Sequence, residues 1–269
     1  MSTDVRETGL KKFNALVENT RTQEYLTNVL GKKKDIFVSN MVALVSNNKA
    51  LAECDAPTIM YSCLKATALG LPLDPSLGLC YVLPYNDKKT GTQVATFQIG
   101  KAGYIQLCLR SGQFKTLNVR DVREGEIVDE DFITGEYKFK RLEKDREKAK
   151  IVGYLSYFAL TNGFSKQLYM TVEELEAHGK KYSQTYKRGY GLWADNKESM
   201  YEKTIVKRLL SKYAPLSIEL SQAIVSDSAV LGENDSVRYV DNEADAYDVE
   251  RAQEVAEKFA DFEEVDKNT

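Results

Sequence analysis

Hydrophobic positions recur with two different periods along this chain, and each period predicts one kind of secondary structure. Apolar residues return every three to four positions through residues 11–29 and 36–45, which predicts two amphipathic helices separated by the basic loop GKKKD. A third helix is predicted over DAPTIMYSCLKATALGL, where Asp55 can cap the start, Pro57 suits the first turn and Gly70 ends the helix. The N-terminal part of the chain is therefore expected to be helical.

The middle of the chain changes to the alternating pattern that is typical of β-strands. The runs GLCYVLPYND and TQVATFQIG flank KKTG, which predicts a β-hairpin. A short helix over KAGYIQLCLRSG precedes the β-like run QFKTLNVRDVREG, and a second hairpin is predicted from KIVGYLSYFALTNG and SKQLYMT. We expect the charged run EYKFKRLEKDREKAK, which lies between these segments, to be a long solvated connection.

Helical spacing returns after Thr171, which is a candidate N-cap in front of an acidic first turn. It continues in MYEKTIVKRLLSKYA, which Pro215 ends, and in a short helix near LSIELSQAI. This order of elements predicts an α+β fold in which antiparallel β-hairpins pack against helices. No apolar run approaches the ~18 residues that a membrane span needs, and MSTDVRETGLKK lacks the core of a signal peptide, so we expect a cytoplasmic protein.

Charge is distributed unevenly, although the net charge of the whole chain is only −3. Residues 216–269 contain 15 acidic and 4 basic residues, whereas residues 1–215 contain 25 acidic and 33 basic residues. We therefore expect a basic core over 1–225 and an acidic tail over 226–269. The tail starts with a polar stretch that predicts disorder and continues with EADAYDVERAQEVAEKFADF, whose spacing predicts a short amphipathic helix.

The run MYEKTIVKRLLSKYA concentrates positive charge on one side of a predicted helix. Its apolar residues gather on one face, and like charges four residues apart on the other face disfavour a helix by a few tenths of a kcal/mol per pair. Either this face is plain solvated surface, or it meets a polyanion, for which nucleic acid is the first candidate. The residues concerned are Lys203, Lys207, Arg208 and Lys212.

Basic and aromatic residues are interleaved just upstream, in HGKKYSQTYKRGYGLW. Lysine and arginine follow phosphates, and aromatic rings stack on unpaired bases for about 1–3 kcal/mol each. The pattern is typical of surfaces that bind single-stranded nucleic acid, although tyrosine-rich loops also pack on protein cores. The candidates for such contacts are Lys180, Lys181, Lys187, Arg188 and Trp193.

Few residues could carry catalysis. The one histidine, His178, has no serine or cysteine in a plausible catalytic set around it, and the phosphate-binding loop of P-loop ATPases is absent. The four cysteines lie far apart without a C-x-x-C pair, which predicts buried free thiols and no zinc site. The acids of DVREGEIVDEDF leave one rival open, a Mg²⁺-dependent, structure-specific nuclease that uses carboxylates between Glu124 and Asp131. We assign no catalytic residue, metal ligand or cofactor.

Three longer blocks resemble the signature blocks of the RecT family of phage single-strand annealing proteins, in the same order and at approximately the same spacing. They are ALGLPLDPSLGLCYVLPYND, FQIGKAGYIQLCLRSGQFKTLNVRDVREGE and MYEKTIVKRLLSKYAPLSIELSQAI. The resemblance covers residues 49–223 and implies a Rad52-like core, a curved antiparallel β-sheet with helices packed on it. It also implies an ATP-independent recombinase for homologous recombination, which coats single-stranded DNA, anneals complementary strands and works as a large oligomer, either a ring or a helical filament.

The same resemblance implies partners in the bacterial host cell. They are single-stranded DNA, the annealed duplex intermediate, further copies of the chain and a 5′→3′ exonuclease. The acidic tail is expected to dock this exonuclease or a host single-strand binding protein; the alternatives are that it competes with DNA for the basic groove or serves only solubility. A third class stays open, a protein-interaction scaffold whose basic face meets acidic partners.

The middle block of the resemblance implies further DNA contacts, each with a structural alternative. A lysine at a helix start can extend along the surface, an aromatic residue can belong to the core, and an arginine in the last turn can stabilise a helix end. The arginine that ends the next predicted strand can pair with Glu124 or Glu126. In chain order the candidates are Lys101, Tyr104, Arg110, Arg120 and Arg123.

Overall fold

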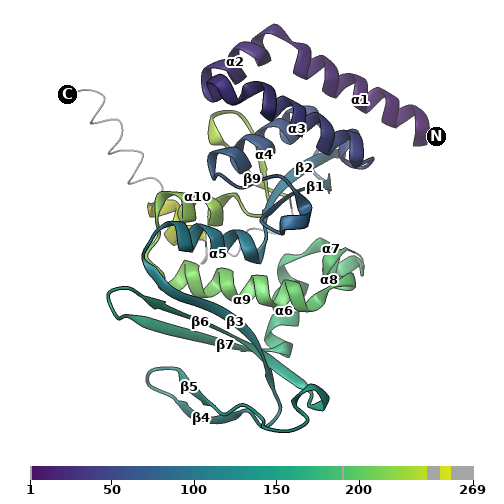
Figure 1. The fold of residues 1–269 in the computed structure, drawn as a ribbon. Coiled ribbons are helices and arrows are strands. Elements are labelled where there is room, and N and C mark those ends of the chain that lie inside the picture. Colours follow the sequence, from purple (N-terminus) through teal and green to yellow (C-terminus); the bar gives the residue numbers. More distant parts are fainter. Residues whose placement is uncertain (1, 190, 241–248, 256–269) are drawn as a thin grey trace. The chain divides into compact units, whose positions relative to one another are not determined.

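The chain divides into two compact units in the computed structural model, which describes residues 2–189, 191–240 and 249–255. The first unit comprises residues 1–99 and 226–240, and the second comprises residues 100–225 and 241–269. Each unit combines helices with antiparallel strands (Figure 1). The predicted α+β class is therefore confirmed, and the fold is consistent with a Rad52-like core.

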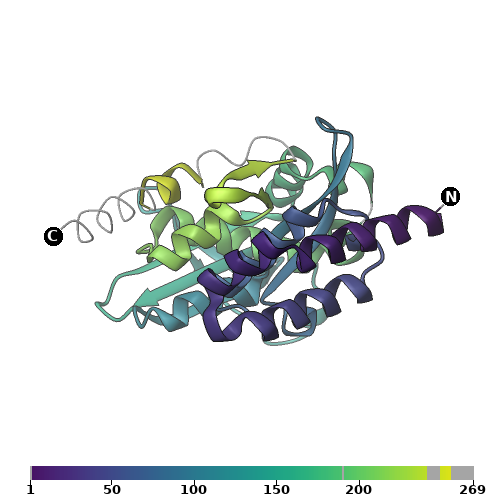
Figure 2. The ribbon, with the colours of Figure 1, turned by 90° about the horizontal axis from the view of Figure 1, so that it is seen from above.

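The N-terminal helices of the first unit share one apolar core. Figures 1 and 2 show α1 and α3 running alongside one another, and the core includes Leu26, Met41 and Ile59. The helix predicted over 11–29 is in fact two helices, because the Asn19 side chain accepts a 2.9 Å hydrogen bond from the backbone N–H of Arg21 and starts a new helix. The helical elements are α1 (Ser2–Glu18), α2 (Thr20–Leu30), η1 (Gly31–Lys33), α3 (Lys34–Asn47), η2 (Leu51–Glu53), α4 (Ala56–Ala68) and η3 (Pro75–Leu77).

The sheet of the first unit begins with the predicted hairpin and ends with strands from far along the chain. Its order is β1-β2-β8-β9, with every neighbouring pair antiparallel. The last two strands come from the segment for which we predicted a disordered tail, and residues 226–240 belong to the first unit. The strands are β1 (Cys80–Asp87), β2 (Thr92–Ile99), β8 (Ala229–Leu231) and β9 (Val237–Tyr239).

Buried polar contacts join the late strands to the early hairpin. The Asp227 carboxylate, 3% exposed, accepts a 3.0 Å hydrogen bond from the backbone N–H of Ile99. The Arg238 guanidinium forms a 2.6 Å ion pair with Asp87, which is 2% exposed. Short runs of apolar residues are enough to form these strands, which explains why the overall composition of the segment suggested disorder.

The second unit contains a three-stranded sheet, a separate hairpin and a helical layer. The sheet order is β3-β6-β7, and the hairpin is β4-β5. Thr171 and Glu174 form the predicted capping box at the start of α6. The strands are β3 (Phe114–Arg123), β4 (Ile127–Asp131), β5 (Glu136–Phe139), β6 (Ile151–Leu160) and β7 (Ser165–Thr171). The helical elements are α5 (Lys101–Arg110), η4 (Arg146–Lys148), α6 (Val172–Tyr182), α7 (Gln184–Arg188), α8 (Leu192–Asp195), α9 (Lys197–Tyr213) and α10 (Ile218–Ser226).

Helix α9 packs across one face of the three-stranded sheet (Figure 1). Tyr154 and Met170 from the strands meet Tyr201 and Ile205 from α9, and Leu175 of α6 completes this core. Helix α5 also contacts α9. The α9 helix is therefore surrounded by other elements and positions the sheet of this unit.

The second unit differs from the sequence expectations in its separate hairpin. Residues Ile127–Asp131 of the acidic run pair as β4 with Glu136–Phe139, the first four residues of the charged run, as β5, whereas we expected the whole charged run to be a solvated connection. Residues 249–255 are helical, in agreement with the middle of the predicted tail helix; the remainder of that prediction lies outside the described residues. Within the portions of the chain that the structure describes, no helix is long and apolar enough to span a membrane.

Candidate nucleic-acid interface

The three-stranded sheet has a face that points away from α9. Side chains alternate between the two faces of a strand, and residues paired across strands share a face. Tyr154, Ser156 and Phe158 of β6 are buried on the α9 side, so the residues between them point to the opposite side. We call this side the outer face. Its residues include Asn118, Arg120, Leu155, Tyr157, Gln167 and Tyr169.

The outer face brings together an arginine, aromatic rings and amides. Arg120 pairs with Leu155, and the neighbouring pair is Asn118 with Tyr157, which is 37% exposed. Diagonal neighbours on one face of a sheet lie about 7–8 Å apart, so a guanidinium and a phenol ring can contact the same nucleotide. Among the paired residues of these three strands, no carboxylate lies on this face. A surface of this kind can bind phosphate and stack on a base without reading its identity.

The β4–β5 hairpin covers the β7 side of the outer face. The rings of Tyr137 and Tyr169 have centroids 5.0 Å apart, and Phe139 lies 6.1 Å from the same Tyr169 ring. Gln167 donates a 3.0 Å hydrogen bond to the carbonyl oxygen of Tyr137. The β3 side, which carries the exposed Arg120 side chain, is consequently the more accessible part of the face.

An ion network fixes the charged segment after β5 against β3. The Arg146 guanidinium donates to both carboxylate oxygens of Glu126, at 2.7 and 3.0 Å, and to the carboxylate of Asp121 at 3.2 Å. Burial alone would raise the pKa of Glu126, but hydrogen bonds from Arg146 and from the backbone N–H groups of Arg123 and Leu142 outweigh burial and lower the pKa to about 2. The Glu126 carboxylate is therefore a structural anion at neutral pH.

The same network engages Arg123, one of the predicted DNA contacts. Its guanidinium donates to Asp121 at 2.5 Å and to the carbonyl oxygen of Ala149 at 2.8 Å. The predicted structural alternative was a pair with Glu124 or Glu126. The observed side-chain partner is Asp121, whereas Glu126 accepts a hydrogen bond from the backbone N–H of Arg123. Arg123 thus has a structural role in the described fold.

The basic residues of α9 do not form an open face. Lys203, Lys207 and Arg208 are half-buried, and only Lys212 of this predicted set is exposed. Thr204 and Ser211, which lie among them on the helix, are buried. The reason is that α9 packs against both the sheet and α5, so tertiary contacts reach further around the helix than its apolar stripe predicts.

Residues predicted on α5 have different environments. Lys101 forms a 2.5 Å ion pair with Glu202 of α9, and Tyr104 is fully buried in the core. Arg110 is exposed in the last turn of the helix, where a positive charge stabilises the helix dipole. Of these three side chains, Arg110 is the one that extends into solvent.

The aromatic and basic segment around α7 and α8 is divided between core and surface. Trp193 is only 6% exposed and packs edge-on against Tyr186 and Tyr201, so its ring has no open face for a base. Lys180, Lys181 and Lys187 are exposed. The Lys181 ammonium lies 4.8 Å from the centroid of the Tyr182 ring. The side chain of Arg188 lies outside the described residues.

Acidic residues between Glu124 and Asp131 form ion pairs and hydrogen bonds within the fold. Glu126 binds Arg146, Asp129 forms a 2.9 Å ion pair with Lys138, and Asp131 accepts hydrogen bonds from the backbone of the β4–β5 turn. No cluster of three or more potential metal ligands occurs within the described ranges of the chain.

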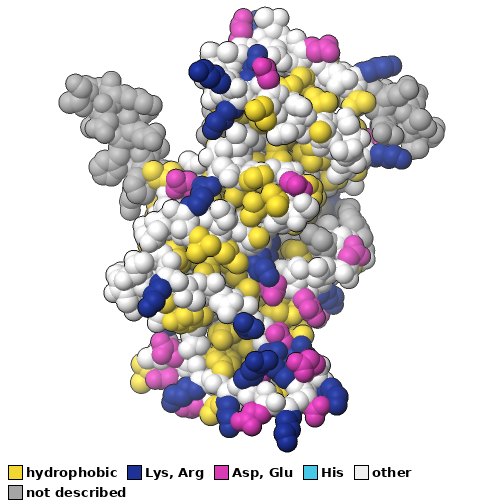
Figure 3. Space-filling view, viewed as in Figure 1, with side chains coloured by type: hydrophobic (Ala, Val, Ile, Leu, Met, Phe, Trp, Pro, Cys, Tyr) yellow, Lys and Arg dark blue, Asp and Glu magenta, His cyan; other side chains and the backbone are white. Residues whose placement is uncertain are grey.

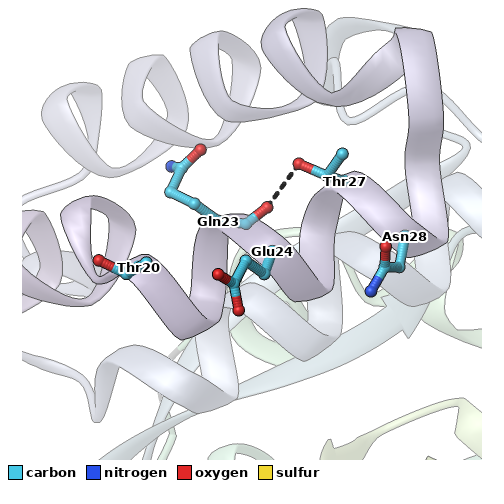
Figure 4. Close-up of a pocket in the computed structure, with 5 residues that line it drawn as sticks. All are labelled: Thr20, Gln23, Glu24, Thr27 and Asn28. Carbon is cyan, nitrogen blue, oxygen red and sulfur yellow. Dashed lines mark hydrogen bonds between the residues drawn. The ribbon is translucent and has the colours of Figure 1, made fainter.

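An open hollow of about 440 Å³ lies along α2, in the first unit (Figure 4). It is lined by hydroxyl and amide side chains and one carboxylate, and Thr27 donates a 2.7 Å hydrogen bond to the carbonyl oxygen of Gln23. None of the described residues that line the hollow is basic, so these side chains offer little to a phosphate. The lining residues are Thr20, Gln23, Glu24, Thr27 and Asn28.

Comparison with known proteins identifies the family. The family model described as RecT family matches residues 35–246, which is most of the chain and extends beyond residues 49–223, over which the three blocks resemble the family. The chain belongs to the RecT family. RecT-family proteins are DNA recombination and single-strand annealing proteins. The resemblance of the three sequence blocks to this family is therefore confirmed.

Two relatives illustrate how far this RecT-family chain has diverged. It is 35% identical over 221 residues to YqaK, an uncharacterized protein of Bacillus subtilis strain 168. The aligned region covers 80% of this chain and 74% of the relative. It is 32% identical over 180 residues to the protein RecT of Escherichia coli strain K12, which covers 66% of this chain and 65% of that protein.

Sequence reasoning missed much of the outer face. It selected Arg120 for its charge but not Asn118, Tyr157 or Gln167, which share the face through strand pairing. The signal was present, because Leu155 and Tyr157 alternate with the buried residues of β6. Recognising it requires knowing that α9 covers the other side of the sheet.

Proposed function

We propose that this RecT-family protein anneals complementary single strands of DNA without ATP, as an oligomer, in homologous recombination in the bacterial cytoplasm. It acts without a metal or cofactor and has no nuclease or ATPase activity. The observation that carries the proposal is the outer face of the β3–β6–β7 sheet, in which Arg120 and Tyr157 lie on a surface free of carboxylates among its paired residues.

Annealing needs no chemical fuel, because stacking in a duplex contributes about 1.4 kcal/mol per base-pair step. The protein has to reduce the repulsion between two phosphate backbones and keep the bases unpaired until a complement arrives. Contacts to phosphates and to ring faces do this while leaving the Watson–Crick edges free. Arginine and tyrosine side chains supply these two kinds of contact, and neither one selects a base sequence.

Exposed lysines extend this interface in the proposal. Lys180, Lys181, Lys187 and Lys212 are on the surface of the same unit as the outer face. Lysine binds phosphate as a point charge, and each additional phosphate contact increases the salt dependence of binding. The annealed duplex intermediate presents two phosphate backbones and would engage more of these lysines than a single strand.

The acidic residues beyond 240 have a different partner in the proposal. Their negative charge repels DNA, so we assign them to protein partners, namely a 5′→3′ exonuclease or a host single-strand binding protein. Removal of residues 241–269 should then lower recombination in cells more than it lowers annealing of purified oligonucleotides.

The interface is tested by binding of fluorescent oligonucleotides to full-length variants across a salt series. Arg120→Ala should weaken binding to all sequences alike and reduce the slope of log K against log salt by about 0.7 for one lost phosphate contact. Tyr157→Ala should lower affinity by about 1–3 kcal/mol, and Tyr157→Phe should preserve it, because the ring supplies the stacking. Lys88→Ala, which removes an exposed charge from the β1–β2 turn, is the matched control. Wild-type affinity and slope in folded Arg120 and Tyr157 variants would remove the outer face from the interface.

A further inference from the structure

The end of the β4–β5 hairpin exposes large apolar side chains. Phe132 and Ile133 are 94% and 93% exposed, and Val128 of β4 is 62% exposed. Neighbouring apolar side chains that a folded element presents to solvent mark an interaction surface. We call residues 127–136 the hairpin tip. Figure 3 shows hydrophobic and acidic side chains beside each other at this end of the hairpin, which lies at the lower left in Figure 1.

Contacts at its base hold the hairpin tip in place. The Asp131 carboxylate accepts hydrogen bonds from the backbone N–H groups of Ile133 at 2.8 Å and Thr134 at 3.1 Å. The Lys166 ammonium donates a 2.8 Å hydrogen bond to the carbonyl oxygen of Thr134, and the Tyr137 ring packs on Tyr169. A preorganised tip loses little conformational freedom when it binds, which favours association.

The charge of the hairpin tip excludes DNA as its partner. Four carboxylates lie in or beside the turn, and the run 127–136 contains no basic residue. Lys138 compensates one of them through its 2.9 Å ion pair with Asp129. The remaining negative charge repels phosphates, so the complementary surface is apolar and basic. The four carboxylates belong to Asp129, Glu130, Asp131 and Glu136.

The corner between α2 and α3 has that complementary character. Val29 and Ile36 are 54% and 68% exposed, and between them Lys32 and Lys33 are exposed. Asp35 is the only acidic residue in the run 29–36. We call this run the basic corner. Figure 3 shows Lys and Arg side chains over this part of the first unit.

We propose that the hairpin tip of one copy docks on the basic corner of the next copy. This proposal rests on the proposed function, which includes an oligomer, and it specifies the two surfaces through which neighbouring copies join. Because the two surfaces differ, the contact is heterologous and builds a ring or a helical filament, not a closed two-fold dimer. An aromatic side chain buries about 150–250 Å² whereas a standard interface buries about 800 Å² per partner, so the tip anchors a larger contact.

Sedimentation velocity of full-length protein without DNA tests the contact through one variant on each surface. The tip variant is Phe132→Ser with Ile133→Ser, and the corner variant is Lys32→Glu with Lys33→Glu. All four side chains are exposed, so thermal unfolding should match the wild type. Each variant alone should associate at least about 10-fold more weakly, as expected for the loss of an anchor.

Matched controls separate this effect from a general loss of surface residues. Leu77→Ser removes an exposed apolar side chain elsewhere, and Lys11→Glu with Lys12→Glu reverses two exposed charges on α1. Both controls should associate as the wild type does.

Mixing the two variants gives the decisive result. The corner variant keeps an intact tip and the tip variant keeps an intact corner, so a mixture should form one-to-one heterodimers that grow no further. Wild-type self-association of either variant, or a mixture that stays monomeric, would overturn the proposal. Loss of oligonucleotide affinity in a tip variant that still self-associates would assign the tip to DNA and overturn it too. The sedimentation experiments contain no DNA, so a negative result there would overturn the tip-to-corner contact and leave the proposed annealing function standing. A wild-type protein that cannot anneal would overturn the proposed function alone.

Discussion

Replacing Glu126 with glutamine should release the charged segment of residues 140–150 in a pH-dependent manner. Glu126 is 5% exposed, and its carboxylate accepts hydrogen bonds from Arg146 and from the backbone N–H groups of Arg123 and Leu142. Glutamine has nearly the same shape but is neutral, and its amide group places donors opposite the donors of Arg146. The substitution therefore removes the charge and one set of hydrogen bonds without opening a cavity.

The magnitude follows from the pKa of this carboxyl group. Its pKa is lowered from 4.5 to about 2, and each pKa unit corresponds to about 1.4 kcal/mol. That gives about 3 kcal/mol, which we reduce to about 2 kcal/mol because part of the network is exposed to solvent screening. A lowered pKa adds stability above the unfolded value near 4.5, and this stability is lost as the pH falls through about 2. The variant should therefore lose about 2 kcal/mol at pH 7 and less than about 1 kcal/mol at pH 3.

Hydrogen exchange measured by mass spectrometry gives the local free energy of opening. Peptides from 140–150 should exchange faster in Glu126→Gln than in the wild type at pH 7, and the difference in the free energy of opening should be less than half as large at pH 3. Peptides from the β1–β2 hairpin of the other unit serve as the internal control and should not change. An equal difference at both pH values, or none at pH 7, would show that the charge of Glu126 does not hold this segment.

Three further substitutions test the packing that surrounds the site. Arg251 donates hydrogen bonds to the carbonyl oxygens of Ser211, in the last turn of α9, and of Ala214, which follows the helix, at 2.8 and 3.0 Å. Arg251→Ala should therefore speed exchange of residues 249–255, and Arg251→Lys should have an intermediate effect, because lysine keeps the charge but not the two-pronged guanidinium. Asp227→Ala should destabilise the first unit by about 1–3 kcal/mol in urea unfolding, because it leaves a buried N–H without an acceptor, and truncation after Val225 should destabilise it further. Gly179→Ala should cost about 1–3 kcal/mol and shift tryptophan fluorescence, because a methyl group there would lie 2.9 Å from the Trp193 ring. Unchanged exchange, unfolding or emission, respectively, would contradict these assignments.

The sequence predicted the elements with strong local signals. The β1–β2 hairpin has clear alternation around a turn, and the α6 capping box appears as Thr171 followed by Glu174. The four cysteines were expected to be buried thiols and are buried. In each case the residues that determine the structure are close together in the chain.

The features that the sequence did not reveal depend on contacts between residues far apart in the chain. Strands β8 and β9 are short and acquire order by adding to β2, more than a hundred residues earlier, so composition alone suggested a disordered tail. The basic stripe of α9 looked like a free surface because a helical wheel does not show that α5 packs on the helix as well as the sheet. Trp193 looked like a stacking residue because burial against Tyr186 and Tyr201 is a tertiary property.

The central claim is most directly tested by the rate at which full-length protein anneals complementary oligonucleotides without any nucleotide. Strands labelled with a donor and an acceptor fluorophore report duplex formation, and the spontaneous rate at the same salt concentration is the baseline. We predict that the protein accelerates annealing above this baseline and that added ATP leaves the rate unchanged. A strict requirement for ATP, or no acceleration by protein that binds the single strands, would contradict the account.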